Sequence, residues 1–324
     1  MSIDILTVKN LETVFYTKNG VIKAVDGVSF NVKKGKTLGI VGESGCGKSV
    51  TSMSILRLIP NENGEITKGD IIFEKESLLD KTKSEMRKIR GKKISMIFQD
   101  SMTALDPSMK IGKQITETIR AHSNLTKKEA KIKAIDLLKK IGLPSPELRI
   151  NEYPHQLSGG MRQRVVIAIA LSCNSNLLIA DEPTTALDVT IQAQILELMK
   201  EIKNTFNTSI ILITHDLGVV SEMADDIIVM YAGKVVEKAD AYNIFKNPLH
   251  PYTKGLMEAI PRITDSGKTL RTIKGTVPDP LNMPKGCRFN TRCNDVMDIC
   301  FKEEPPLFNI ENSYVRCWKY KNTM

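Results

Sequence analysis

The 324-residue sequence predicts an α/β fold with a mostly parallel sheet that is covered by helices on both faces. Two observations lead to this prediction. Short, unbroken apolar runs typical of fully buried strands recur along the chain, and segments with helical periodicity separate them. The runs are Thr37–Val41, Leu177–Ala180, Ile210–Ile213 and Ile227–Met230. A strand with one face in water would alternate apolar and polar residues, so the unbroken runs favour burial on both faces.

The long region between the first two runs is predicted to be helical. Ala130, Ala134, Leu137 and Ile141 share one face of a lysine-rich amphipathic segment. Residues from about 100 to 175 are therefore expected to form an all-α insertion. After about residue 240 prolines accumulate, and four of the six cysteines lie between positions 287 and 317. We expect a separate, irregular C-terminal extension there.

Composition excludes several classes of protein. The net charge is +9, but acidic and basic residues are interleaved, so charge alone does not indicate a nucleic-acid binder. The densest basic stretch, Lys81–Lys93, is interpreted as a solvated helix face, with contact to lipid headgroups or a partner as the alternative. The N-terminus, Met1–Asp4, has no secretory pattern. The longest apolar run, Val165–Leu171, is far below the roughly 20 residues of a membrane-spanning helix. We expect a cytosolic protein.

A phosphate-binding loop follows the first strand. Residues 42–49 match the pattern G-x-x-x-x-G-K-[ST] in full, and they stand between a predicted strand and a predicted helix, Ser49–Leu58. Glycines let backbone N–H groups converge on phosphate oxygens, and the helix N-terminus adds a favourable dipole. Lysine supplies charge to the outer phosphates, and the serine hydroxyl can ligate Mg²⁺. The predicted nucleotide contacts are Gly42, Glu43, Ser44, Gly45, Cys46, Gly47, Lys48, Ser49 and Val50, with Cys46 a bystander in the chemistry.

A second part of the predicted nucleotide site is the strand at 177–180, which is followed by two carboxylates. Asp181 can hold the water shell of Mg²⁺. Glu182 can polarise the attacking water as a general base. Acids at strand ends are common, so this pattern gains weight only because the phosphate-binding loop is also present.

The segment Leu157–Gln163, with the sequence LSGGMRQ, resembles the signature motif of ABC ATPases. It lies in the helical insertion, shortly before the acidic strand, as in that family. Ser158, Gly159 and Gly160 open a helix, which is again suited to an anion. Helicases, kinases, motors and GTPases share the phosphate-binding loop, but this segment favours the ABC family over them.

The resemblance implies roles for further residues. Gln99, which ends the strand Ile94–Phe98, is similar to the Q-loop glutamine that contacts Mg²⁺ and water. His215 is similar to the switch histidine that touches the γ-phosphate, and Asp188 closes a segment, Thr185–Asp188, that resembles the D-loop of the dimer interface. Phe15 is the expected aromatic that stacks on adenine, with Tyr16 as the alternative.

The family mechanism implied by this resemblance needs two ATP-binding domains. They sandwich two ATP molecules, so that Lys48 and Gln99 act on one nucleotide while Ser158 and Gly160 act on the neighbouring one. ATP binds the closed dimer better than the open one and thereby shifts the equilibrium towards closure. Closure drives separate transmembrane permease subunits. The expected location is the cytoplasmic side of the cell membrane, as a peripheral protein.

The C-terminal part narrows the family. Asn247–Thr253, Gly286–Phe289 and the cysteines that follow resemble the C-terminal module of oligopeptide and dipeptide importer ATPases, most closely the D-type subunit. That subunit pairs with a paralogous ATPase and receives peptides through an extracytoplasmic binding protein. Nickel or other small-solute import and a soluble ABC ATPase are the alternatives. The expected domains are residues 1–245, which bind nucleotide, and 246–324, the extension.

Cysteines at 287, 293, 300 and 317 form the pattern C-x₅-C-x₆-C-x₁₆-C. A cytosolic location disfavours disulfides, and four thiolates suffice for a [4Fe–4S] cluster or a Cys₄ zinc site. Zinc usually prefers a short C-x₂₋₄-C spacing, which is absent here, whereas wider loops can surround a cluster. The resemblance to importer ATPases with this tail favours iron–sulfur over zinc or free thiols. We expect the metal to fold the extension and to have no direct part in ATP hydrolysis. The predicted ligands are Cys287, Cys293, Cys300 and Cys317.

Overall fold

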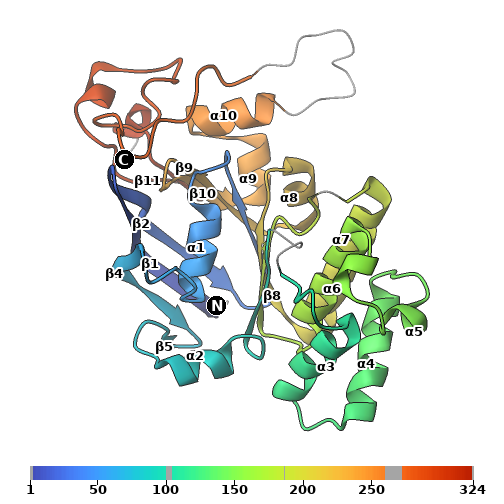
Figure 1. Cartoon of the computed structure of the whole chain (residues 1–324). Coiled ribbons are helices and arrows are strands. Elements are labelled where there is room, and N and C mark those ends of the chain that lie inside the picture. The colour runs from blue at the N-terminus through green and yellow to red at the C-terminus, as the bar shows by residue number, and fades with distance from the viewer. Residues whose placement is uncertain (1–2, 100–103, 186, 260–271, 323–324) are drawn as a thin grey trace. The chain divides into compact units, whose positions relative to one another are not determined.

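A computed structural model describes residues 3–99, 104–185, 187–259 and 272–322 (Figure 1). The chain divides into two compact units. One consists of residues 1–5, 32–36 and 80–213, and the other of residues 6–31, 37–79 and 214–324. Each unit therefore combines segments that are distant in sequence.

The first unit has three parallel strands in the order β6-β7-β8, and helices connect them along the chain. Its strands are β6 (Ile94–Ile97), β7 (Leu177–Asp181) and β8 (Ser209–Ile213). Between β6 and β7 the described elements are all helical, and α3, α4 and α6 pack against one another (Figure 1). The helices of this unit are α2 (Lys83–Ile89), α3 (Ile111–Ala121), α4 (Lys127–Lys140), α5 (Pro146–Arg149), η1 (Pro154–Gln156), α6 (Gly159–Leu171) and α7 (Val189–Phe206). The prediction of an all-α insertion is confirmed.

The core-facing side of α4 differs slightly from the prediction. Ala130, Ala134 and Ile141 are buried as expected, but the leucine that completes their face is Leu138. Leu137 is only half-buried. The helix begins with a capping box, in which the side chains of Thr126 and Glu129 each accept a hydrogen bond from the other residue's backbone N–H. This cap fixes where the helix starts.

The second unit contains an antiparallel sheet that the sequence did not indicate. Its strand order is β2-β1-β4-β5, formed by β1 (Asp4–Thr17), β2 (Gly20–Lys33), β4 (Gly64–Phe73) and β5 (Glu76–Ser77). The pairing of β1 with β4 shifts register between Lys9 and Thr13. Such irregular strands do not show a clean alternation of apolar and polar residues, which explains why the pattern was missed.

The other sheet of this unit holds the phosphate-binding loop. In it β3 (Thr37–Val41) is parallel to β9 (Asp226–Tyr231), which is antiparallel to β10 (Lys234–Asp240). The sheet continues through β12 (Ser313–Val315) and β11 (Phe308–Ile310), so the C-terminal extension adds strands to it (Figure 1). The helices are α1 (Lys48–Ile55), α8 (Leu217–Met223), α9 (Ala241–Lys246), α10 (Pro251–Glu258), η3 (Asp298–Phe301) and η4 (Trp318–Tyr320).

The four apolar runs are confirmed as strands, and their residues are buried. The predicted C-terminal ends of one helix and one strand were wrong. Helix α1 ends at Ile55 and not at Leu58, and β6 ends at Ile97, so Gln99 lies two residues beyond its strand. The basic stretch contains α2, a helix that buries only Met86, as expected for a solvated face. None of the helices in the described part of the chain is long and apolar enough to cross a membrane.

Candidate functional site

The loop between β3 and α1 owes its shape to its glycines. Gly42, Gly45 and Gly47 have φ angles of 152°, 78° and 99°, which side-chain-bearing residues rarely adopt. A Cβ atom on Gly42 would lie 2.2 Å from the carbonyl oxygen of Met230, and one on Gly47 would lie 2.3 Å from that of Ala24. Two of the three glycines therefore let neighbouring backbone approach the loop, and their replacement needs the backbone to move.

The Lys48 side chain forms hydrogen bonds to the backbone of its own loop. Its side chain is buried, and its ammonium donates to the carbonyl oxygens of Gly42 at 2.7 Å and of Glu43 at 3.0 Å. The Cys46 sulfur lies 3.7 Å from the same nitrogen. Burial raises the pKa of the Cys46 thiol, so it stays neutral at neutral pH. This supports the interpretation of Cys46 as a bystander.

The N-terminus of α1 suits an anion. The cap residue is Gly47, which has no side chain to satisfy the first N–H groups of the helix. The first turn, Lys48 to Val50, carries no acidic residue. Helix dipole and open N–H groups together favour negative charge at this point. Ser44 and Gly45 of the loop are exposed, and Ser49, in the first turn of the helix, is half-buried.

Residues of the C-terminal extension hold the loop at Glu43, which the sequence did not indicate. The Tyr252 hydroxyl accepts a hydrogen bond from the Glu43 N–H at 2.8 Å. The Arg292 guanidinium donates to both carboxylate oxygens of Glu43, at 2.6 and 3.0 Å. The partners are 249 residues apart in sequence, so no local pattern could have linked them.

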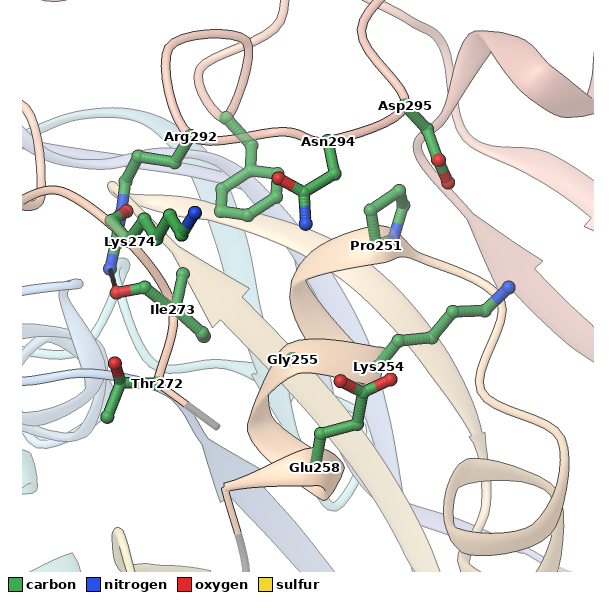
Figure 2. Close-up of a pocket in the computed structure, with 11 residues that line it drawn as sticks. Pro251, Lys254, Gly255, Glu258, Thr272, Ile273, Lys274, Arg292, Asn294 and Asp295 are labelled. Atoms are coloured by element: carbon green, nitrogen blue, oxygen red, sulfur yellow. Dashed lines mark hydrogen bonds between the residues drawn. The ribbon is translucent and has the colours of Figure 1, made fainter. Parts of the chain in front are cut away.

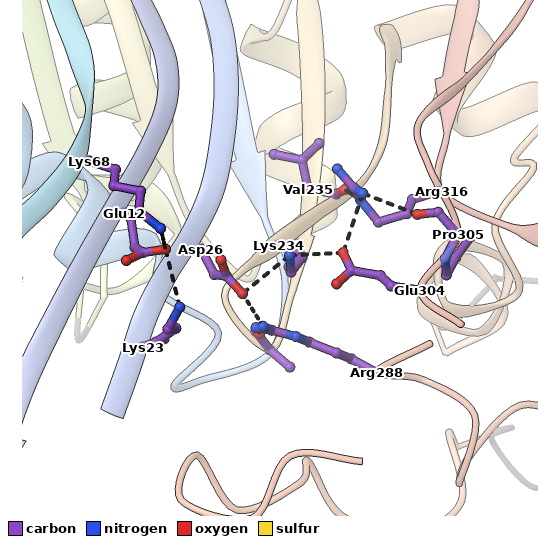
Figure 3. Close-up of polar contacts among 11 residues, drawn as sticks. Glu12, Lys23, Asp26, Lys68, Lys234, Val235, Arg288, Glu304, Pro305 and Arg316 are labelled. Atoms are coloured by element: carbon purple, nitrogen blue, oxygen red, sulfur yellow. Dashed lines mark hydrogen bonds and ion pairs between the residues drawn. The ribbon is translucent and has the colours of Figure 1, made fainter. Parts of the chain in front are cut away.

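The turn between β9 and β10 supports the loop from another side. Gly233 donates its N–H to the carbonyl oxygen of Cys46 at 3.0 Å and accepts from the N–H of Asp26 at 2.9 Å. Arg288 of the extension donates to the Ala232 carbonyl and to the Asp26 carboxylate (Figure 3). The turn is thus fixed from both sides.

The aromatic candidates lie on β1 of the same unit. The Phe15 ring is half-buried, and a Cβ added to Gly64 would lie 2.9 Å from it. Tyr16 is 50% exposed, and its hydroxyl donates to the Glu65 carboxylate at 2.9 Å. Both rings retain an accessible part on which a base could stack.

The carboxylates lie in the first unit, at the end of β7. Asp181 is the last residue of the strand and is buried. Glu182 has a positive φ of 49°, and its N–H donates to the Ile213 carbonyl at 2.8 Å. The Thr185 hydroxyl donates to its carboxylate at 2.9 Å. A positive φ is uncommon for a non-glycine residue, and these two hydrogen bonds hold Glu182 in it.

The signature segment opens α6 in the same unit. Ser158 caps the helix, its hydroxyl accepting from the Met161 N–H at 3.4 Å. Gly159 and Gly160 form the first turn. The buried Gln163 amide donates to the Pro183 carbonyl at 2.5 Å and thereby ties this helix to the segment that follows Glu182.

The remaining predicted residues lie at element ends. Asp188 caps α7 by accepting from the Ile191 N–H at 3.0 Å. Gln99 is exposed beyond β6, and His215 is exposed before α8. Ala186, within the expected D-loop segment, lies outside the described residues.

The four C-terminal cysteines lie on neighbouring segments. The Cys287 N–H donates to the Cys300 carbonyl at 2.8 Å. Burial, with smaller contributions from the neighbouring thiols, raises the pKa of Cys287 to about 12 and that of Cys293 to about 11. Within the described residues, no group of three or more His, Cys, Asp or Glu side chains is placed to hold a metal ion. The metal site therefore stays a prediction.

Known proteins resemble nearly all of this chain in sequence. The family model described as "ABC transporter" matches residues 25–185, and "Oligopeptide/dipeptide transporter, C-terminal region" matches residues 236–300. The oligopeptide transport ATP-binding protein AppD of Bacillus subtilis is 55% identical, over 98% of this chain and 97% of that protein. The oligopeptide transport ATP-binding protein OppD of Escherichia coli is 46% identical, over 97% of this chain and 93% of that protein.

The dipeptide transport ATP-binding protein DppD of Bacillus subtilis is 51% identical, over 97% of this chain and 94% of that protein. Among solved structures, the ATP-binding cassette MJ0796, a dimer in a post-hydrolysis state with ADP and phosphate, matches with a TM-score of 0.67 and 28% identity. That match covers 73% of this chain and 98% of the other.

We predict that Gly47→Ala destabilises the protein by at least about 2 kcal/mol, because the new methyl group meets a carbonyl oxygen and the φ angle is unfavourable for alanine. Urea denaturation measures this change. The matched control is Gly159→Ala, where a methyl group meets no described atom within 4 Å and the backbone is helical. Equal stability of the two variants would contradict the described shape of the loop.

Proposed function

The chain belongs to the oligopeptide/dipeptide family of ABC transporter ATP-binding proteins, and we propose that it hydrolyses ATP to power the import of di- or oligopeptides through separate membrane subunits. The observation that carries this proposal is the loop at 42–49, with its glycine-dependent geometry and its buried Lys48, in a chain whose curated relatives match it from end to end.

Partners follow from the same proposal. Closure on ATP needs a second ATP-binding domain, and the likeness to D-type subunits favours a paralogous chain, giving a heterodimer. Two transmembrane permeases would transmit the closure, and an extracytoplasmic peptide-binding protein would deliver cargo. The chain would then lie on the cytoplasmic side of the membrane as a peripheral subunit. Residues 1–245 would act on nucleotide, with a helical subdomain at about 100–175, and residues 246–324 would form the extension.

The residues divide the chemistry as follows. Lys48 and the loop amides bind the phosphates, while Phe15 stacks on the base. Mg²⁺ would neutralise charge on the phosphates when bound, and the family resemblance assigns Ser49, Gln99 and Asp181 as the residues that would hold it. Glu182 takes a proton from water, and His215 contacts the γ-phosphate. Ser158 to Gly160 and Asp188 act across the dimer.

We also propose that Cys287, Cys293, Cys300 and Cys317 bind a [4Fe–4S] cluster. A single zinc ion needs sulfur atoms roughly 3.8 Å apart, because Zn–S bonds are about 2.3 Å long. The sequence spacing C-x₅-C-x₆-C-x₁₆-C has no short C-x₂₋₄-C pair of the kind that zinc usually prefers, and its wider loops can surround a larger cluster. Binding would stabilise a segment with little regular structure.

Iron analysis tests the cluster. Protein purified without oxygen is expected to be brown, to absorb near 400 nm and to contain about four irons per chain. Cys300→Ser should lose the colour, and Cys173→Ser, which alters a cysteine outside this group, should keep it. Colourless wild-type protein with one zinc per chain would exclude the cluster and leave the ATPase proposal untouched.

ATP binding and turnover in two variants test the main proposal. Glu182→Gln should slow hydrolysis roughly 10²–10⁴-fold while ATP still binds, because it removes only the general base. Lys48→Ala should instead weaken ATP binding itself, because it removes charge from the phosphates. Nucleotide affinity and turnover are measured in the assembled complex. Near wild-type turnover in Glu182→Gln, or unchanged affinity in Lys48→Ala, would refute the assigned roles.

A further inference from the structure

We infer that Arg292, in the C-terminal extension, is a positioning residue for the phosphate-binding loop and sets its affinity for ATP through Glu43. The inference rests on the proposed function, since it assumes that the loop binds ATP. It adds a residue outside the nucleotide motifs and gives the extension a part in nucleotide binding that the sequence did not predict.

The contact between Arg292 and Glu43 is a fork of two hydrogen bonds, at 2.6 and 3.0 Å. The Arg292 side chain is 3% exposed, whereas that of Glu43 is 29% exposed. A bidentate pair between a guanidinium and a carboxylate is among the strongest and most directional polar contacts in proteins. Glu43 is thus held in one position by a buried cation.

Arg292 is itself fixed on several sides. Its Nε donates to the Lys274 carbonyl at 3.0 Å, and it lies in the wall of a cavity of 540 Å³ (Figure 2). The guanidinium lies 5.8 and 5.9 Å from the ring centres of Tyr231 and Phe289, within the range of a cation–π contact. The arginine therefore does not need to become ordered when it binds Glu43.

Charge explains why this contact matters for ATP. The loop binds a polyanion, yet Glu43 places a negative charge within the loop itself. Lys48 alone would only cancel that charge, whereas Lys48 and Arg292 together leave the loop with a net positive charge. Without Arg292 the carboxylate would repel the phosphates at short range.

The same part of the extension fixes the backbone of the loop. The Tyr252 hydroxyl is bonded to the Glu43 N–H, and Tyr252 packs on Phe289, three residues before Arg292. Arg288 donates to the carbonyl of Ala232, and the next residue, Gly233, donates to the Cys46 carbonyl. The loop is therefore supported at Glu43 and at Cys46 by residues 288–292 and their neighbours.

A double-mutant cycle in the full chain, made of Arg292→Gln, Glu43→Gln and the two combined, separates charge from general destabilisation. We expect Arg292→Gln to weaken ATP binding about ten-fold or more. Glu43→Gln combined with Arg292→Gln should recover most of the affinity, because the unpaired carboxylate is then absent. Arg292→Lys should lie between wild type and Arg292→Gln, since it keeps the charge and loses the fork. Dissociation constants for ATP are measured by calorimetry.

The matched control is Arg316→Gln, which removes an arginine of the same extension. The Arg316 guanidinium donates to Glu304 and to the carbonyls of Val235 and Pro305, none of which lies in the loop. Its ATP affinity should equal that of wild type. Wild-type affinity in Arg292→Gln, or a double variant no tighter than Arg292→Gln, would overturn the inference. If Arg292→Gln does not fold, an ATP affinity of Arg292→Lys equal to that of wild type would also overturn the inference. Failure of wild-type protein to bind ATP would instead refute the proposed function.

Discussion

Backbone N–H groups can bind a polyanion only if their loop keeps its shape before the anion arrives. In this chain that shape depends on the close approach of the loop to neighbouring backbone, which glycine permits at positions 42 and 47. Lys48 bonds to the loop's own carbonyls, and Gly233 bonds to Cys46. The contacts of Tyr252 and Arg292 with Glu43 add to this small framework.

The C-terminal extension is part of that framework. Its strand β12 pairs with β10, and two of its aromatic residues, Tyr252 and Phe289, pack in one buried cluster with Tyr231 at the end of β9. A chain segment with many prolines and few regular elements gains order by attaching to a sheet that already exists. The resulting position brings Tyr252 and Arg292 to Glu43, so folding of the extension and shape of the loop depend on the same contacts.

The features that could be predicted from the sequence are those that depend on residues close together in the chain. Four unbroken apolar runs became buried strands, and the pattern at 42–49 became a strand–loop–helix, because each depends on neighbouring residues alone. The Arg292–Glu43 pair and the β1–β4 pairing depend on residues distant in sequence and leave no periodic pattern. The family resemblance supplied roles for Gln99 and His215, since an isolated glutamine or histidine gives no signal of its own.

Amide hydrogen exchange with and without ATP and Mg²⁺ tests the central claim most directly, because it shows where ATP acts without altering a residue. We expect slower exchange in residues 42–52, and in 286–300, where the extension supports the loop. The short segment 311–315, at the far strands of the sheet, should change little. If the amides of residues 42–52 exchange at the same rate with and without saturating ATP, the account is contradicted.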